Sequence, residues 1–313
     1  MRKYDRNALF NIILKGILFI IAFAGTFLLS YALLKTDLII SAVLSSVIAL
    51  SVIVLFSILL RYTRFYYSYY SFVSGFLFRA KSGKVYCPCC GKHFDNFRDE
   101  RFYADKVHFN PAMFSKSGQD VICDFCRSAP RHRIIAEWAE QNTAKLKSSR
   151  ILYFAPELSM MLWFRRHGIS VKTADLFDRR ADLKLDITSI DLPDGSEDII
   201  FCNHVLEHVH DYSSALSELH RIIRKGGILI ISFPIDPDSD TVRELLNGSE
   251  EDRRRILGQS DHLRIFGQDS SRILEDAGFE VSTIDISGMP DNILPVAGPC
   301  DYDTNMIFCC ISK

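Results

Sequence analysis

The chain has 313 residues, which is enough for about two domains, and its formal net charge of −1 hides a strong asymmetry. Residues 1–80 carry eight Lys and Arg against two acidic residues (+6), whereas residues 81–313 carry 29 against 36 (−7), a poor match for a nucleic-acid phosphate backbone. Nine cysteines, four of them in C-x-x-C pairs, favour metal binding in a reducing compartment over a disulfide framework.

Two long runs without a charged residue stand near the N-terminus. Residues 16–34 form a run of 19 and residues 38–60 a run of 23. Each would cross a hydrocarbon core of about 30 Å at about 1.5 Å per residue. Basic residues precede the first run and follow the second, so the positive-inside rule places both termini in the cytoplasm. The sequence therefore predicts an integral membrane protein with a transmembrane hairpin and a cytoplasmic catalytic domain.

The segment that follows, residues 61–80, is RYTRFYYSYYSFVSGFLFRA. Tyr and Phe crowded around arginines are typical of a segment that lies at the lipid headgroups. A simple continuation of the second helix is the competing interpretation. We assign residues 1–80 to the membrane hairpin with this interfacial segment.

Two cysteine pairs follow, Cys87/Cys90 in CPCCGKHF and Cys123/Cys126 in CDFCRSAPRHR. Two such knuckles bring four thiolates to one tetrahedral ion, as a structural zinc site requires. The neighbouring Cys89 and His93 leave the register of the first knuckle open. The sequence predicts a four-cysteine zinc module over residues 81–135, with no ligand position left for water.

A basic cluster, RSAPRHR, follows the second pair and contains Arg131, His132 and Arg133. Such a cluster could contact an anionic substrate. A solvated helix start is the more common explanation, and we favour it here.

From residue 150 onward, short apolar runs alternate with amphipathic ones, which predicts a parallel sheet with helices on both faces. A helix is expected over residues 212–224, with Asp211 as N-cap and Gly226-Gly227 as its stop, and another over about 269–277. The expected strands are ILYFA (151–155), SVKTA (170–174), LKL (183–185), DIIFC (198–202), ILIISF (228–233), EVSTIDI (280–286) and NMIFCCI (305–311).

The stretch FCNHVLEHVHD (201–211) allows two interpretations. His204, Glu207 and His208 spell H-x-x-E-H, the signature of one class of zinc peptidases, which requires both histidines on one continuous helix. Here the apolar run DIIFC leads directly into the motif, and a helix is expected only after Asp211. The context favours a strand end and a loop that faces a ligand.

The order LPDGSEDIIFCNHVLEHV, then a helix, then RKGGILIISFP, resembles the second half of class I S-adenosylmethionine (SAM) methyltransferases, and AGFEV before the last strands extends the similarity. The resemblance covers about residues 150–313, and we assign the methyltransferase domain to residues 145–313. It is closest to a branch with A-P-E after the first strand and a Cys-rich module upstream. It implies a Rossmann-like, doubly wound α/β fold that binds SAM at the carboxyl ends of the strands.

The resemblance also implies cofactor-binding residues. Asp175 would accept the ribose hydroxyls, Asp186 the adenine amino group with Ile187 beside the ring, and Asn203 would line the floor near the methyl group. The first loop, YFAPE, departs from the usual glycine-rich turn. Ala155 is small enough for close approach, and Glu157 could accept the ammonium of the methionine tail. For each aspartate, an N-cap or a surface turn is the competing role.

Methyl transfer to an oxygen nucleophile needs positioning and a general base. His204, His208 and, in GQSDHLRIFG (258–267), His262 are the catalytic candidates. Capping and packing of the loop is the competing role for Glu207 and His208. A metal-dependent variant is a further alternative, since some quinone-ring O-methyltransferases use an acid-x-x-Glu-His cluster here, but His204 replaces the first acid in this chain. The sequence thus predicts a membrane-anchored SAM-dependent methyltransferase of unknown acceptor, with a lipid-linked or surface glycan suggested by location. An inactive membrane scaffold and, against the acidic charge, an RNA methyltransferase are the alternatives.

Overall fold

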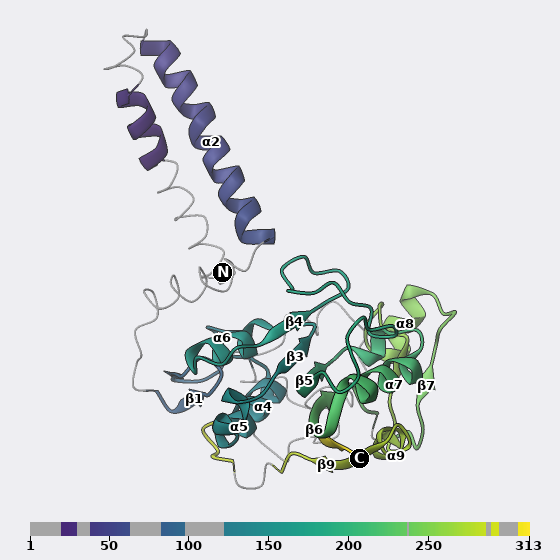
Figure 1. Cartoon of the computed structure of the whole chain (residues 1–313). Coiled ribbons are helices and arrows are strands. Elements are labelled where there is room, and N and C mark those ends of the chain that lie inside the picture. The colour runs from purple at the N-terminus through teal and green to yellow at the C-terminus, as the bar shows by residue number, and fades with distance from the viewer. Residues whose placement is uncertain are drawn as a thin grey trace. The chain divides into compact units, whose positions relative to one another are not determined.

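The computed structural model divides into two compact units, Met1–Tyr70 and Ser71–Lys313 (Figure 1). The second unit contains both cysteine pairs and the α/β domain. The structure describes residues 20–29, 38–62, 83–97, 122–236, 238–285, 289–293 and 306–313.

The first unit contains a helical segment at residues 20–29 and the helix α2 (Leu38–Tyr62). Within the described ranges, no helix is both long enough and apolar enough to cross a membrane.

The predicted spans at 16–34 and 38–60 are therefore corrected, and with them the localisation as an integral membrane protein with cytoplasmic termini. Apart from the end of α2, the predicted interfacial segment lies outside the described residues. A lipid-linked or surface-glycan acceptor was inferred from membrane attachment alone, so that suggestion loses its basis.

The second unit is built on one mixed sheet of six strands in the order β4-β3-β5-β6-β10-β9. The first four are parallel, and β10 runs antiparallel to both of its neighbours. This is the Rossmann-like α/β arrangement that the sequence predicted. The strands are β3 (Ile151–Phe154), β4 (Lys172–Ala174), β5 (Glu197–Asn203), β6 (Ile223–Ser232), β9 (Phe279–Thr283) and β10 (Phe308–Ser312).

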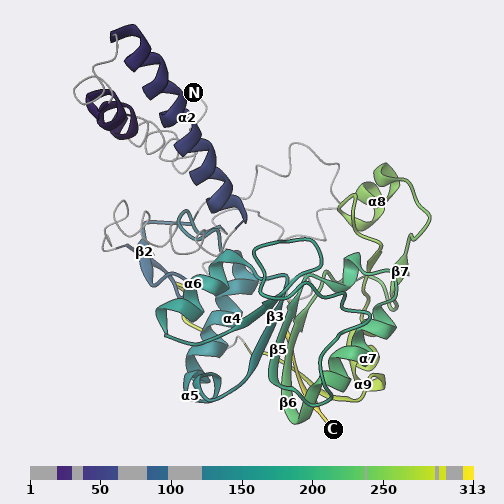
Figure 2. The ribbon, with the colours of Figure 1, turned by 45° about the horizontal axis from the view of Figure 1, so that its top comes forward.

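Helices cover both faces of this sheet, as Figure 2 shows. Trp138 of α4 and Phe164 of α6 pack edge-on against Phe201, whereas Leu216 and Leu219 of α7 join the core of the opposite face. This two-sided burial explains why the strands read as continuous apolar runs. The helices are α4 (Pro130–Gln141), α5 (Thr143–Lys147), α6 (Leu158–Arg166), α7 (Tyr212–Ile222) and α9 (Ser270–Asp276).

Two expected elements differ in detail. The run LKL makes a single isolated bridge, between Leu183 and Ala174, instead of a strand. The reason is that Asp182 Oδ2 accepts both the backbone N–H and the hydroxyl of Thr173, at 2.8 Å each, and so occupies donors of the β4 edge. The helix expected to reach residue 224 ends at Ile222, and β6 starts at once, with a bulge at which Gly226 adopts a φ of +70°.

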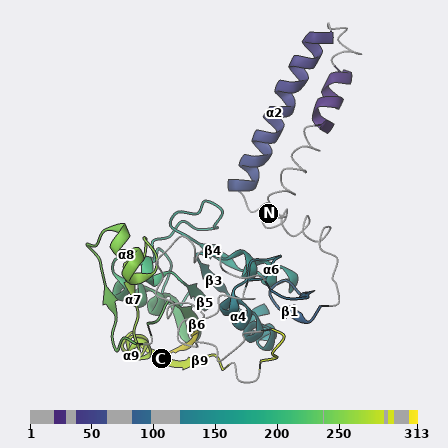
Figure 3. The ribbon, with the colours of Figure 1, turned by 180° about the vertical axis from the view of Figure 1, so that it is seen from behind.

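A small subdomain follows β6 and was not expected from the sequence. The strands β7 (Arg243–Glu244) and β8 (Arg264–Ile265) pair antiparallel around helix α8 (Glu250–Leu257). Ser249 caps α8 by accepting the Asp252 N–H, and Gly258 ends it at a φ of +89°. Figure 3 shows α8 at the opposite side of the second unit from β1 (Val85–Cys87), which pairs with β2 (Lys92–Phe94).

Candidate functional site

The carboxyl ends of β3 and β5 lie side by side, paired in register from Ile151↔Ile199 to Phe154↔Cys202. The chain leaves β3 toward β4 on one side and leaves β5 toward β6 on the other. A strand order that reverses in this way opens a crevice at the carboxyl edge, where α/β sheets bind ligands.

Backbone conformation singles out the same edge. Among the described residues, three that are not glycine have a positive φ, and two of them follow these strands: Ala155 at +47° and His204 at +53°. Their amides are fixed, since the Ala155 N–H donates to the Ala174 carbonyl at 2.9 Å and the His204 N–H to the Ser232 carbonyl at 2.8 Å. Left-handed backbone at non-glycine residues costs energy and clusters at functional sites.

Asn203, the last residue of β5, is buried, and only one of its two side-chain polar atoms has a hydrogen bond. Its Oδ1 accepts a hydrogen bond from the Ser232 hydroxyl at 2.9 Å, which fixes the amide orientation. Its Nδ2 is buried without a hydrogen-bond partner among the described residues. A buried orphan donor calls for an explanation, and a ligand atom at the carboxyl edge provides one.

The two predicted aspartates each stabilise a turn. Asp175 follows β4, and its Oδ1 accepts the N–H groups of Phe177 and Asp178 at 2.7 and 2.8 Å. Asp186 Oδ1 accepts the Thr188 N–H and hydroxyl at 2.9 and 2.7 Å, and these bonds lower its pKa. Both aspartates therefore have the turn-stabilising role that competes with cofactor binding. In Asp175 these bonds involve Oδ1, so Oδ2 is the atom that could bind a ligand. Ile187 is buried and belongs to the core cluster of this face.

Glu157, at the start of α6, meets two residues of the basic cluster. Its Oε1 lies 2.8 Å from Arg131 Nη2 and 2.5 Å from His132 Nε2, and its Oε2 accepts from the Tyr153 hydroxyl at 3.5 Å. His132 Nδ1 accepts the Ala129 N–H, so the ring proton resides on Nε2, the nitrogen that contacts Glu157. Burial raises the pKa of Glu157, but the neighbouring His132 and Arg131 lower it by more, and the net pKa lies well below its ordinary value.

The basic cluster is therefore not a solvated helix start. Arg133 is fully buried, lies 4.1 Å over the ring of Phe97, and donates from Nε to the Ile293 carbonyl and from Nη1 to the Ser128 carbonyl. The Arg133 guanidinium thus connects Ser128, beside the second cysteine pair, with Ile293 near the end of the chain.

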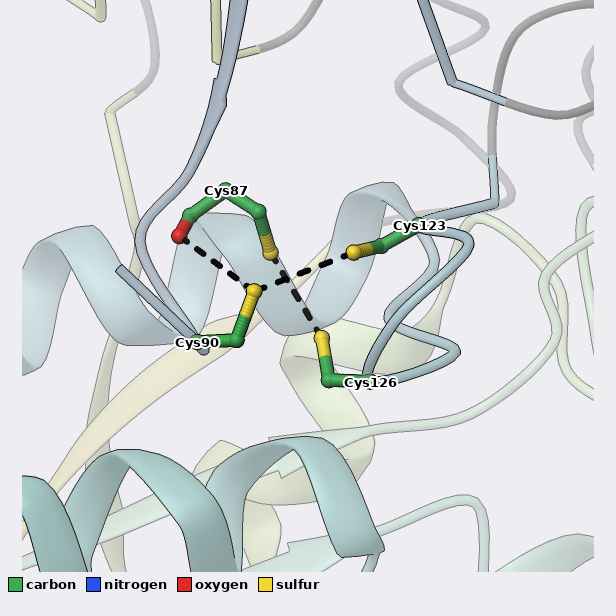
Figure 4. Close-up of side chains that lie close together, drawn as sticks. All are labelled: Cys87, Cys90, Cys123 and Cys126. Carbon is green, nitrogen blue, oxygen red and sulfur yellow. Dashed lines mark hydrogen bonds between the residues drawn. The ribbon is translucent and has the colours of Figure 1, made fainter. Parts of the chain in front are cut away.

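The four predicted ligand cysteines come together (Figure 4). Cys87 Sγ and Cys126 Sγ are 3.6 Å apart, Cys90 Sγ and Cys123 Sγ are 3.9 Å apart, and all four sulfurs lie within 4.8 Å of one another. A tetrahedral ion with Zn–S bonds of about 2.3 Å would place its sulfurs about 3.8 Å apart. The arrangement fits zinc.

The two knuckles repeat one backbone turn. The Gly91 N–H donates to the Cys87 carbonyl at 2.8 Å, and the Arg127 N–H donates to the Cys123 carbonyl at 3.0 Å. Gly91 and Arg127, each directly after the second cysteine, have φ values of +70° and +63°. Equivalent turns aim both pairs at one point.

Cys89 and His93, which left the first register open, are not part of the four-sulfur group. Cys89 Sγ donates to the His132 carbonyl at 3.4 Å, outside the four-sulfur group. His93 is exposed on β2 and stacks near Tyr86.

The three predicted catalytic histidines gather around Glu207, which is fully buried in the 3-10 helix η3 (Leu206–His208). His204 Nδ1 lies 3.0 Å from Glu207 Oε1. The rings of His208 and His262 meet edge-on with centroids 4.9 Å apart. The motif therefore runs from strand through a loop into a single 3-10 turn, and its histidines do not share the continuous α-helix of a peptidase.

Sequence reasoning missed the residue that holds this loop. Arg264 of β8 is fully buried and donates to the carbonyls of Leu206, Val209 and His210, and to Glu244 Oε1 at 2.8 Å. An arginine two residues after His262, inside an otherwise apolar run, was the available signal.

A family model described as "Methyltransferase domain" matches residues 162–231. An uncharacterised 37.1 kDa protein of transposon TN4556 from Streptomyces fradiae is 36% identical over 100 residues, 32% of this chain and 29% of that protein. A probable S-adenosylmethionine-dependent methyltransferase of Mycolicibacterium smegmatis is 28% identical over 99 residues, 30% of this chain and 33% of that protein.

A shorter match, 47% identical over 47 residues, is to the malonyl-[acyl-carrier protein] O-methyltransferase of Yersinia pestis, covering 15% of this chain and 18% of that protein. The chain thus spans a third or less of the length of these curated relatives.

Among solved structures, the YcgJ protein of Bacillus subtilis is 15% identical, with a TM-score of 0.37, over 58% of this chain and 99% of that chain. A SAM-dependent methyltransferase of Mesorhizobium loti is 14% identical, with a TM-score of 0.38, over 56% and 97%. We draw nothing about the site from likenesses of this degree.

Proposed function

Because the chain carries a class I SAM-dependent methyltransferase domain, we propose that the protein transfers the methyl group of SAM to an acceptor oxygen held beside His204, His208 and His262. The observation that carries the proposal is the convergence at one sheet edge: the orphan amide of Asn203, the strained backbone of His204 and the histidine group all follow β5.

SAM supplies a methyl group on a sulfonium, and the chain has to hold that sulfur and exclude water. Asp175 accepts the ribose hydroxyls through the oxygen that its turn does not use, and Asn203 Nδ2 donates to the cofactor near the reacting carbon. Asp186 and Ile187 stand at the adenine end. Glu157 keeps the first loop in place and, with Oε2, faces the ammonium of the methionine tail.

The transfer is an in-line displacement. The acceptor oxygen forms a bond to the methyl carbon, the carbon–sulfur bond breaks with its electrons going to sulfur, and S-adenosylhomocysteine leaves. The acceptor proton goes to a histidine, for which His204 is the nearest to the sheet edge. Positioning supplies much of the rate of such a reaction, and a general base adds roughly 10²–10⁴-fold.

The four-cysteine group holds zinc as a structural ion in this proposal. Zinc would join the two knuckles, and four thiolates leave no coordination position for water. Arg133 and His132 follow the second knuckle and reach the α/β domain, so loss of the ion would loosen the start of α4 and the loop that contains Glu157.

Calorimetry on the full chain tests the proposal. SAM and S-adenosylhomocysteine are expected to bind at one site, and labelled SAM with fractionated small-molecule and macromolecular acceptors is expected to yield an O-methylated product by mass spectrometry. Methyl transfer to a nitrogen or carbon atom would contradict the proposed oxygen acceptor. Absence of heat with wild-type protein would leave the inactive scaffold as the better interpretation.

A further inference from the structure

Three side chains near the sheet edge form a second group with the geometry of a metal site. Glu207, His208 and His262 each offer one ligand atom, and these atoms lie within 4.8 Å of one another. Two of the residues come from η3, and the third from the loop after α8. Glu207 and His262 are buried, whereas the His208 side chain is 35% exposed, so the group has a closed side and an open side.

In both histidines the hydrogen bond of Nδ1 leaves Nε2 as the atom that can bind a metal. His262 Nδ1 lies 2.9 Å from the Leu257 carbonyl, and His208 Nδ1 lies 3.2 Å from the Asp261 carbonyl. A carbonyl oxygen only accepts, so each Nδ1 carries the proton and each Nε2 keeps its lone pair. Histidines that bind metals are held in this way, with the second ring N–H donated to a carbonyl or carboxylate.

Glu207 supplies the negative charge. Its carboxylate is fully buried, contacts His204 Nδ1 at 3.0 Å, and has no well-aligned hydrogen bond among the described residues. A buried carboxylate with so little compensation is costly. A dication between Glu207 and the two imidazoles would remove that cost.

We propose that Glu207, His208 and His262 bind one transition-metal dication, Zn²⁺ or Fe²⁺, at a site separate from the four-cysteine group and open on the His208 side. Two imidazoles and one carboxylate select such ions over Mg²⁺ and Ca²⁺, which prefer oxygen ligands. Three protein ligands with a free position are the pattern of catalytic rather than structural zinc. His204 is not a ligand of this site but its neighbour, since its Nδ1 lies 3.0 Å from Glu207 Oε1.

The use of this site rests on the proposed function. An acceptor hydroxyl bound at the free position of the dication would lose electron density to the metal, which would lower the pKa of that hydroxyl and fix its oxygen on the side from which it attacks the methyl carbon. The proton leaves to His204 or to water. Metal binding itself does not depend on SAM, so the two claims can fail separately.

Metal stoichiometry of the full chain tests the site. Metal-free protein titrated with Zn²⁺ under reducing conditions is expected to bind two equivalents. His208→Ala is the first variant, because His208 is exposed and its loss should leave the fold intact, and Glu207→Gln is the second. Each is expected to bind one equivalent tightly and the other at least a hundredfold more weakly. His210→Ala, an exposed histidine of the same loop, is the matched control and should bind two.

Cobalt substitution identifies which site is lost. Co²⁺ in the four-cysteine group gives thiolate charge-transfer bands, and Co²⁺ bound by imidazole and carboxylate does not. His208→Ala should keep the thiolate bands and lose the second cobalt, whereas Cys123→Ser should do the reverse. One equivalent in folded wild-type protein, or two in both His208→Ala and Glu207→Gln, would overturn the site. Two equivalents without SAM binding would keep the site and reject the proposed function.

Discussion

Nε2 of His132 lies 2.5 Å from Oε1 of Glu157, and this contact joins the segment after the second cysteine pair to the loop after the first parallel strand. Arg131 contacts the same oxygen at 2.8 Å. The knuckle that would hold zinc and the loop that would hold the methionine tail of SAM are therefore joined by the segment from Cys126 to His132 and by the contacts of Arg131 and His132 with Glu157. A substitution in the segment after the second cysteine pair should therefore alter SAM affinity, and a substitution in the loop after β3 should alter zinc affinity.

Replacing His132 by Leu tests this connection. The change removes the N–H that faces Glu157 and leaves a partly buried carboxylate with Arg131 alone, so the free energy of unfolding should fall by about 1–3 kcal/mol. SAM affinity should fall with it, because the loop loses a fixed contact. His167→Leu is the control: His167 also contacts a carboxylate, Glu140 at 3.0 Å, but lies at the far end of α6. Unchanged SAM affinity in His132→Leu would reject the connection.

The pH dependence of stability gives a second test of the same pair. The folded-state pKa of Glu157 is lowered by His132 and Arg131 despite burial, so its ionised form stabilises the fold. That contribution is complete above the ordinary pKa of about 4.3 and is lost as the pH falls through the folded value. In urea unfolding, the stability difference between wild type and Glu157→Gln should be constant from pH 6 to 8 and shrink below about pH 4.3. A difference that grows toward acid would contradict this assignment.

Zinc stoichiometry separates the four ligand cysteines from the neighbouring Cys89. Cys123→Ser should remove the tightly bound zinc of the four-cysteine group and lower the thermal midpoint, since metal binding contributes directly to folding. Cys89→Ser is a stringent control, because Cys89 is buried beside the knuckle but its Sγ donates to the His132 carbonyl. Retention of that zinc in Cys123→Ser, or its loss in Cys89→Ser, would show that the ligand set is wrong.

The sequence predicted the sheet because its signals were local. Runs such as DIIFC are apolar on both faces, and Asp211 caps α7 by accepting the Ser214 N–H, as its position before an amphipathic run suggested. The paired C-x-x-C spacing likewise placed four sulfurs at one point. Each signal, the strand run, the cap or a single C-x-x-C pair, is contained within a few positions of the chain.

The errors came from interactions between distant residues. The burial of Arg133 depends on Phe97 and on the Ile293 carbonyl, 160 residues away, which no local pattern of charges reveals. The contact between Glu157 and Arg131, 26 positions earlier, was equally invisible to local reasoning. The two predicted membrane spans are a separate error, which rested on counting uncharged residues: within the described ranges no helix is both long enough and apolar enough to cross a membrane.

SAM affinity should distinguish residues of the carboxyl edge from those at the other end of the sheet. Asp175→Ala should weaken SAM binding about ten- to a hundredfold, the equivalent of about 1.5–3 kcal/mol for a lost hydrogen-bonded carboxylate. Asp198 is the control, because it binds Arg150 and Arg224 at the amino end of β5. Asp198→Asn should lower stability and leave SAM affinity unchanged. Equal affinities in wild type and Asp175→Ala would remove Asp175 from the site.

His204 is best tested by Asn, because its φ of +53° is one that Asn tolerates better than Ala or any branched residue. The variant keeps the backbone and its hydrogen bond to the Ser232 carbonyl, but it loses the imidazole that faces Glu207. SAM affinity should stay within a few-fold of wild type, since the side chain faces the acceptor. The rate of methyl transfer should fall by roughly 10²–10⁴-fold, the range for a lost general base. Calorimetry with SAM and single-turnover transfer measure the two quantities on the same preparation.

A His204→Asn protein that transfers at the wild-type rate would assign the proton to another group. One that no longer binds SAM would place His204 at the cofactor instead.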